Sequence, residues 1–336
     1  MTFSIKKWCK LGCSYHLIVY TARRPQKPSF KVRVDYNLDN KRKAKMFHGS
    51  IVALITPMRE NGDIDYICLR KLVDWHIAQR TDAIVVIGTT GEASTLNIEE
   101  QTNVIKTVVE QTHRRIPVIA STGTQSTQKT IEQTRAAMEI GVDACLLVTP
   151  YYNLPTQEGL YQHYRLIADK VPIPQILYNI PKRTGCDLLP DTVARLAGIA
   201  NIVGIKEGQP ERVKTILELC GKNIDVYSGD DNTALEIIRM GGKGVISVAA
   251  NLVPQTMHNL YEFAYKEDWE TAAKMDEQLR PLYQGLFVET NPIPVKWLAA
   301  EKGLIPSSLL RLPLTTLSAG HQGDLKPIID LLEALA

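Results

Sequence analysis

The stretch IVGIKEG, residues 202–208, contains the strongest local indication of how this chain folds. Its β-branched run is typical of a strand that is covered on both faces. The run ends in Lys206, although lysine is almost never fully buried without a partner or a purpose. Lys206 either lies just past the strand end and extends its ammonium to solvent, or is a desolvated amine whose lowered pKa lets it attack a carbonyl.

Similar short runs occur before and after this stretch, so that eight strands are predicted in all. They are IVALITP (51–57), AIVVIGTT (83–90), PVIAST (117–122), ACLLVTP (144–150), QILYNIP (175–181), IVGIKEG (202–208), DVYSGD (225–230) and GVISVAA (244–250). They recur at intervals of roughly 20–35 residues, the size of a βα unit. With seven helical segments between them and an eighth after residue 254, the pattern predicts a (β/α)8 barrel.

The segment 97–115 illustrates the helices that are expected between the strands. Asn97 is followed three residues later by Glu100, a spacing typical of a capping box at a helix start. Its apolar residues are spaced to share one face of a helix: Ile98, Ile105, Val108 and Val109.

Three regions follow from this pattern. The barrel is expected over residues 46–267, and residues 268–336 are expected to form a C-terminal helical subdomain, since they contain patterns such as LKPIIDLLEALA. No linker composition separates the two. Residues 1–45 form a basic N-terminal extension with twelve Lys or Arg and two acids, which is a net charge of +10. Because the whole chain has a net charge of +3, the remaining residues carry −7. A mildly acidic body does not indicate nucleic-acid binding.

Three interpretations of residues 1–45 compete. The favoured one is a disordered or non-native extension, with translation starting at Met46, because low apolar content and high charge cannot build a core. A transit peptide would be basic and acid-poor, but this segment has only three serines and no good amphipathic helix. A signal peptide fits least, since the apolar region LGCSYHLIVYTA is weak and is broken by His16.

The composition bears on the cellular location of the protein and on whether it binds a metal. No uninterrupted apolar run approaches the roughly 18–20 residues of a membrane span. The six cysteines lack paired spacing, which favours reduced thiols and a cytoplasmic location. The histidines form no metal-ligand spacing, so no metal is expected.

Hydroxyl and basic residues lie in or just after the carboxyl-terminal parts of the predicted strands, where active sites of such barrels lie. They are Thr89, Thr90, Tyr151, Tyr152, Tyr178, Arg183 and Lys206. An amine ringed by hydroxyls fits Schiff-base chemistry with a carbonyl substrate, because hydroxyls can pass the protons that imine formation needs. This convergence favours the catalytic interpretation of Lys206.

Each neighbouring group also has a plainer interpretation. GTTGE (88–92) offers backbone N–H groups and two hydroxyls to a small carboxylate, or is simply a strand-to-helix turn. Arg183 can bind a second carboxylate bidentately, or is a solvated loop residue. Tyr151 and Tyr152 can be packing aromatics. In SGDD (228–231), an aspartate is expected to cap the next helix, while Gly229 leaves room for a ligand.

Five motifs occur in one order along the chain: GTTGE, VTPYYN, YNIPKRTG, GIKEG and GVISV. Together they resemble the dihydrodipicolinate synthase family, from about Met46 to the C-terminus. The resemblance implies condensation of pyruvate with L-aspartate 4-semialdehyde, the first committed step towards diaminopimelate and lysine, without a cofactor.

The resemblance also implies roles for individual residues. Lys206 would form the imine with pyruvate, and Tyr178 would be the acid/base group, relayed through Thr89 and Tyr152. In the family, the tyrosine that matches Tyr152 comes from a neighbouring subunit, which implies a dimer, usually within a homotetramer.

Substrate-binding roles follow in the same way. Thr90 would hold the pyruvate carboxylate together with Thr89, with Gly229 and the backbone of Ile246 nearby. Arg183 would bind the carboxylate of the semialdehyde. Its presence favours this family over the sialic-acid lyases, which usually have GSTGE where this chain has GTTGE.

Two departures from the family pattern stand out. The loop GQPERV (208–213) is about two residues shorter than the enterobacterial pattern. At the expected lysine-effector site, the histidines, asparagine and glutamate of lysine-sensitive members are replaced by Ile98, Gln101, Gln125 and Lys129, while Tyr151 is retained. Because a cation stands where an acid would pair the inhibitor's ammonium, the chain is expected to be insensitive to L-lysine.

Two other functions stay open. A related pyruvate-dependent aldolase or dehydratase could act on a sugar acid with the same barrel and lysine. A catalytically inactive barrel could serve as a scaffold, although an intact lysine and carboxylate-binding set argues against it.

Overall fold

The computed structural model describes residues 3–11, 14–22, 34–36 and 47–335. Two compact units are present, Met1–Met46 and Phe47–Ala336. In the first, β1 (Phe3–Leu11), β2 (Ser14–Ala22) and β3 (Val34–Tyr36) form an antiparallel sheet in that order. The sequence predicted no regular structure here, and these strands differ from that expectation. The rest of the extension lies outside the described residues.

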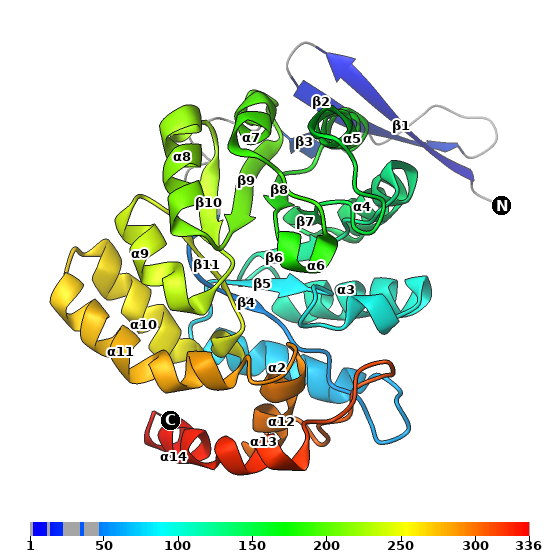
Figure 1. Ribbon diagram of the computed structural model, residues 1–336. Helices are drawn as coiled ribbons and strands as arrows, with labels where there is room; N and C mark the ends of the chain where they lie inside the picture. Colours follow the sequence, from blue (N-terminus) through cyan, green and yellow to red (C-terminus); the bar gives the residue numbers. More distant parts are fainter. Residues whose placement is uncertain (1–2, 12–13, 23–33, 37–46, 336) are drawn as a thin grey trace. The chain divides into compact units, whose positions relative to one another are not determined.

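Eight parallel strands close into a barrel in the second unit, as the sequence predicted (Figure 1). They are β4 (Gly49–Ala53), β5 (Ala83–Val86), β6 (Val118–Ser121), β7 (Ala144–Val148), β8 (Gln175–Tyr178), β9 (Ile202–Glu207), β10 (Asp225–Ser228) and β11 (Gly244–Ser247). Neighbours along the chain pair with each other, and β11 pairs with β4. The predicted runs extend beyond most strands on the carboxyl side, because those residues belong to the loops of one rim.

Helices follow the strands and cover the outside of the barrel (Figure 1). They are α2 (Tyr66–Ala78), α3 (Ile98–Thr112), α4 (Thr127–Ile140), α5 (Gln157–Lys170), α6 (Pro181–Thr184), α7 (Pro190–Ala197), α8 (Pro210–Cys220), α9 (Ala234–Arg239) and α10 (Pro254–Tyr265). Beyond them lie α11 (Trp269–Gly285), α12 (Ile293–Glu301), α13 (Ala319–Asp324) and α14 (Lys326–Ala334). Among the described residues, no helix is both long and apolar enough to span a membrane.

The start of α3 confirms the predicted capping box. The Asn97 side chain accepts a hydrogen bond from the Glu100 N–H, and the Glu100 carboxylate accepts one from the Asn97 N–H, both at 2.9 Å. Of the residues on the predicted apolar face, Ile105 and Val108 are buried, Val109 is half-buried and Ile98 is 60% exposed. Ile98 is the first residue of α3, at the N-terminal end of that face.

Small and aromatic side chains share the barrel interior. Gly204 of β9 has no side chain where the ring of Tyr227 lies, and a Cβ there would come within 2.8 Å of the tyrosine Cε2. The Tyr227 hydroxyl donates to the Phe47 carbonyl at 3.1 Å. This packing fills the barrel beside Lys206, which pairs with Tyr227 in the β9–β10 register.

A buried ion pair fixes the C-terminal segment to the turn after β5. The Lys296 side chain is fully buried in α12, and its Nζ donates to Glu92 Oε1 and to the Leu309 carbonyl, each at 2.6 Å. The second oxygen of Glu92 accepts from the Arg311 N–H at 3.2 Å. Glu92 belongs to GTTGE, so the C-terminal helices restrain the loop that carries Thr89 and Thr90. The boundary between barrel and subdomain at 267/268 stays a prediction.

Replacing Lys296 by methionine is expected to lower the free energy of unfolding by about 3–5 kcal/mol, because Glu92 keeps a buried charge without its partner. Lys274→Met is the matched control, since Lys274 is largely exposed and pairs with Glu270 at 2.7 Å on the surface of α11. That variant should change stability little. Urea denaturation of both measures the difference, and equal midpoints would contradict the role given to the buried pair.

Candidate functional site

Lys206 and Tyr178 lie side by side on neighbouring strands of the barrel. They are directly opposite each other in the β8–β9 register. The Lys206 Nζ lies 4.5 Å from the centroid of the Tyr178 ring. Lys206 is only 7% exposed, so the solvent-extended interpretation is wrong and the amine is desolvated.

Burial sets the protonation of both groups. Desolvation lowers the pKa of Lys206 to about 8, with Asp231 opposing that shift and Arg183 adding to it. Desolvation raises the pKa of Tyr178 to about 12, with Arg183 opposing the shift and Glu207 adding to it. Near neutral pH the phenol therefore keeps its proton, while part of the lysine population is a neutral nucleophile.

The loop after β10 makes room for the lysine. A Cβ on Gly229 would lie 3.2 Å from the Lys206 Cε, so the predicted space at Gly229 is occupied by the lysine side chain itself. Asp230 caps the short helix Asp231–Thr233 by accepting from the Asn232 N–H, as expected for one aspartate of SGDD. The buried Asp231 instead accepts hydrogen bonds from the N–H groups of Val248 and Ala249, both at 3.0 Å.

A cavity of about 870 Å³ opens over this rim, and Tyr178, Arg183, Gly229 and Asn291 line it. The Asn291 amide donates to the Thr90 hydroxyl at 3.0 Å, and its main-chain carbonyl accepts from the Arg183 guanidinium at 3.3 Å. Asn291 thus connects the two groups predicted to bind carboxylates. Sequence reasoning missed it, because NPIPVK (291–296) carries only the signals of a turn and a helix start.

The other predicted site residues are placed differently. Thr89 is exposed, and Tyr152 is 91% exposed. Among the described residues, no hydrogen bond joins either side chain to Tyr178. Ile246 is buried in the barrel interior, opposite Ile51 in the register. One chain therefore brings together Lys206 and Tyr178, but not the predicted relay.

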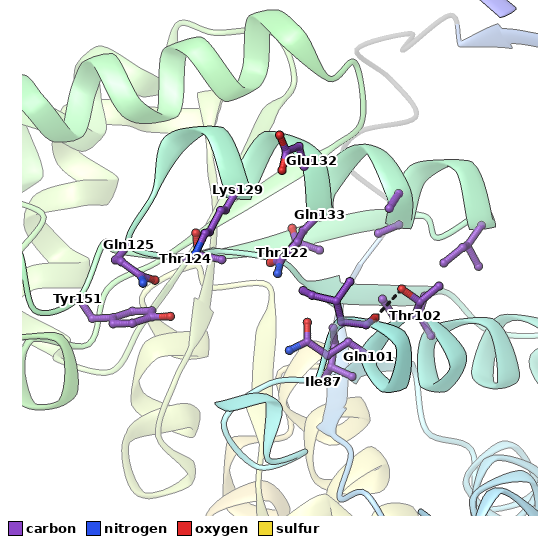
Figure 2. A pocket seen from close by; sticks show the side chains of 15 residues that line it. Ile87, Gln101, Thr102, Thr122, Thr124, Gln125, Lys129, Glu132, Gln133 and Tyr151 are labelled. Atoms are coloured by element: carbon purple, nitrogen blue, oxygen red, sulfur yellow. Dashed lines mark hydrogen bonds between the residues drawn. The ribbon is translucent and has the colours of Figure 1, made fainter. Parts of the chain in front are cut away.

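A second cavity, of about 560 Å³, lies between α3 and α4 (Figure 2). Its lining includes all residues of the expected effector site: Ile98, Gln101, Gln125, Lys129 and Tyr151. The Gln101 amide donates to the carbonyls of Ala93 and Leu96, so it is already engaged. Glu132, one helical turn from Lys129, also lines this cavity and accepts a hydrogen bond from Gln128 at 2.7 Å.

Comparisons with known proteins agree with this geometry. The model of the dihydrodipicolinate synthetase family matches residues 46–332. A relative from Nitrosococcus oceani, called 4-hydroxy-tetrahydrodipicolinate synthase, is 57% identical over 275 residues, which are 81% of this chain and 94% of that protein.

The chain is also similar to solved structures of dihydrodipicolinate synthases. The chloride-inhibited dihydrodipicolinate synthase from Acinetobacter baumannii, complexed with pyruvate, is 49% identical with a TM-score of 0.83, over 85% of this chain and 99% of that one. The enzyme from Cyanidioschyzon merolae with lysine bound is 34% identical with a TM-score of 0.83, over 86% and 99%.

The Lys206 amine is expected to react with an amine-specific reagent in a pH-dependent manner, with a midpoint of about 8. Only the neutral amine is nucleophilic, and burial disfavours the charged form. Mass spectrometry of the Lys206 peptide, after brief labelling across a pH series, measures this midpoint. Lys206→Met supplies the blank. A midpoint at the ordinary lysine value of about 10.4 would contradict the desolvated amine.

Proposed function

The chain belongs to the dihydrodipicolinate synthetase family, and from this premise we propose that it condenses pyruvate with L-aspartate 4-semialdehyde through an imine at Lys206. The observation that carries the proposal is the buried Lys206 amine beside the protonated Tyr178 at the barrel rim. The pyruvate complex of the Acinetobacter baumannii relative supports pyruvate as the first substrate.

The chemistry follows from the two protonation states. Neutral Lys206 adds to the keto carbon of pyruvate, and the oxygen leaves as water when the imine forms. Tyr178, whose ring centroid lies 4.5 Å from the Lys206 Nζ, is proposed to give a proton to that oxygen and to accept one later. Thr90 is proposed to bind the pyruvate carboxylate, and Arg183 the semialdehyde carboxylate, as a charge-assisted pair. Gly229, which leaves room for the Lys206 side chain, and the backbone of Ile246 are proposed to lie near the bound pyruvate.

We propose that the active form is at least a dimer, and that Tyr152 of one subunit completes the relay with Thr89 of the other. The support is that Tyr152 extends into solvent with a positive φ of 75°. Leu154 on the same loop and Ile98 at the start of α3 are also 61% and 60% exposed, a surface suited to a second copy. Within the family the expected assembly is a homotetramer. Sedimentation velocity of the working enzyme measures this, and a fully active monomer contradicts it.

We propose further that L-lysine does not inhibit this enzyme. Lys129 places a cation in the cavity between α3 and α4, where a bound lysine would bring its own ammonium groups. Glu132 lies in the same cavity, but its Oε1 is already an acceptor for Gln128.

Incubation with pyruvate and borohydride is expected to add one reduced pyruvate to Lys206 in the wild type. The Lys206→Ala variant should gain no mass and lose turnover with aspartate semialdehyde, because it lacks the buried amine that forms the imine. Lys274→Ala, on the exposed face of α11, should behave as the wild type. A wild-type protein that gains no adduct contradicts the proposed function. If the adduct forms but aspartate semialdehyde is not turned over, the second substrate would instead be a sugar-acid aldehyde.

Turnover is expected to stay flat as L-lysine is titrated into the millimolar range. The Lys129→Glu variant should become measurably more sensitive than the wild type, since an acid can pair the effector's ammonium. Initial rates at fixed pyruvate measure both. Inhibition of the wild type at micromolar lysine would refute the role given to Lys129.

A further inference from the structure

We propose that Asn179 and Glu207 are positioning residues that hold Tyr178 and Lys206 in register from the other face of the barrel wall. Each directly follows one member of the reacting pair along the chain. The inference rests on the proposed function, because it assigns these residues a part in imine formation at Lys206.

The backbone places the second pair next to the first. Tyr178 is the last residue of β8, and it pairs with Lys206 of β9. Beyond it, the Asn179 N–H donates to the Lys206 carbonyl at 3.1 Å, which extends the ladder by one bond. Because side chains alternate along a strand, Glu207 projects from the face opposite to Lys206.

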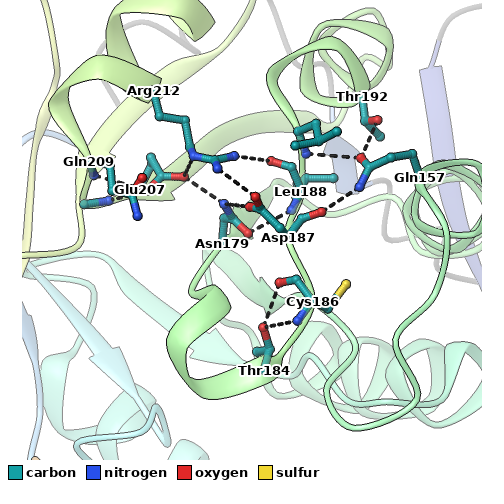
Figure 3. Close-up of polar contacts among 12 residues, drawn as sticks. Gln157, Asn179, Thr184, Cys186, Asp187, Leu188, Thr192, Glu207, Gln209 and Arg212 are labelled. Carbon is teal, nitrogen blue, oxygen red and sulfur yellow. Dashed lines mark hydrogen bonds and ion pairs between the residues drawn. The ribbon is translucent and has the colours of Figure 1, made fainter.

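The two side chains bond each other directly (Figure 3). The Asn179 Nδ2 donates to Glu207 Oε2 at 2.8 Å and to Asp187 Oδ1 at 3.0 Å, while its Oδ1 accepts from the Leu188 N–H at 3.0 Å. Both residues are almost completely buried. A charge-assisted bond in a dry setting is strong, so it ties the end of β8 to the end of β9.

The Glu207 carboxylate is itself fixed by the loop that follows β9. Its Oε1 accepts from the N–H groups of Gly208 and Gln209, at 2.9 and 3.2 Å. Arg212, in the first turn of α8, lies 3.7 Å from Oε2 and pairs with Asp187 at 2.7 Å. The short loop between β9 and α8 thereby compensates the buried charge, which would otherwise be costly.

The bond between Asn179 and Glu207 affects Tyr178 and Lys206 in two ways. First, the bond limits sliding between the strand ends where Tyr178 and Lys206 meet, and a misplacement of about 1 Å costs roughly 10²-fold in rate. Second, the charge of Glu207 adds to the raised pKa of Tyr178, which helps to keep the phenol protonated. A residue that only stabilised the fold would have neither effect.

The test compares three variants with the wild type: Asn179→Ala, Glu207→Gln and the two combined. The measured quantity is the rate of borohydride-trapped adduct formation at saturating pyruvate, alongside thermal unfolding. Each single change is expected to slow trapping by about 10- to 100-fold. The double variant should lose no more than the more severe single one, because both act through the same bond.

Asn201→Ala is the matched control. Asn201 precedes β9 at its opposite end, where its amide donates to the carbonyls of Ala168 and Val171 at 3.0 and 3.1 Å. This variant should lose stability but trap pyruvate at the wild-type rate. If Asn179→Ala does not fold, the nearly isosteric Glu207→Gln decides the matter alone.

The results of this test distinguish the positioning role of Asn179 and Glu207 from the proposed imine chemistry at Lys206. A wild type that forms no adduct overturns the proposed function and removes the basis of the inference. A wild type that traps normally, with variants that trap at the same rate, overturns the inference alone. Equal slowing in Asn201→Ala also overturns it, because general destabilisation would then explain the effect.

Discussion

Desolvation of one amine is the constraint on which this structure depends. Lys206 is placed inside a barrel wall, where water is excluded and the ammonium form is penalised. That penalty lowers its pKa towards neutrality, and the same dry environment keeps Tyr178 protonated. Small residues make this placement possible, since Gly229 leaves room for the lysine and Gly204 for its neighbour Tyr227. Packing in the barrel therefore makes the Lys206 amine a nucleophile and keeps the Tyr178 phenol available as an acid.

Segments that are distant in sequence fix the positions of the groups around the Lys206 amine. The turn after β5 is restrained by the buried Lys296–Glu92 pair, and Asn291 links Thr90 to Arg183. On the other face of the wall, the bond between Asn179 and Glu207 joins the strand ends that present Tyr178 and Lys206. The C-terminal helices are therefore part of the site, because they restrain groups that the barrel alone would leave on mobile loops.

Local signals made the barrel and the lysine predictable from sequence. Eight apolar runs at a regular spacing predicted the strands, and the cap formed by Asn97 and Glu100 predicted the start of α3. Contacts between remote segments left no such signal, which is why Asn291 and the Glu207 network were missed. Burial along the apolar face of α3 was not predictable from periodicity: Ile98, at its N-terminal end, is 60% exposed, whereas Ile105 is buried. Tyr152 was predicted to act across a subunit boundary, and in one chain its side chain extends into solvent.

The most direct test of the central claim is a crystal structure of the protein soaked with pyruvate. The account predicts continuous density between the Lys206 Nζ and the keto carbon of pyruvate. Its carboxylate should lie at the Thr90 hydroxyl, and the Tyr178 hydroxyl should be in hydrogen-bond reach of the reacting centre. Pyruvate bound away from an unmodified Lys206, at full occupancy and neutral pH, would contradict it.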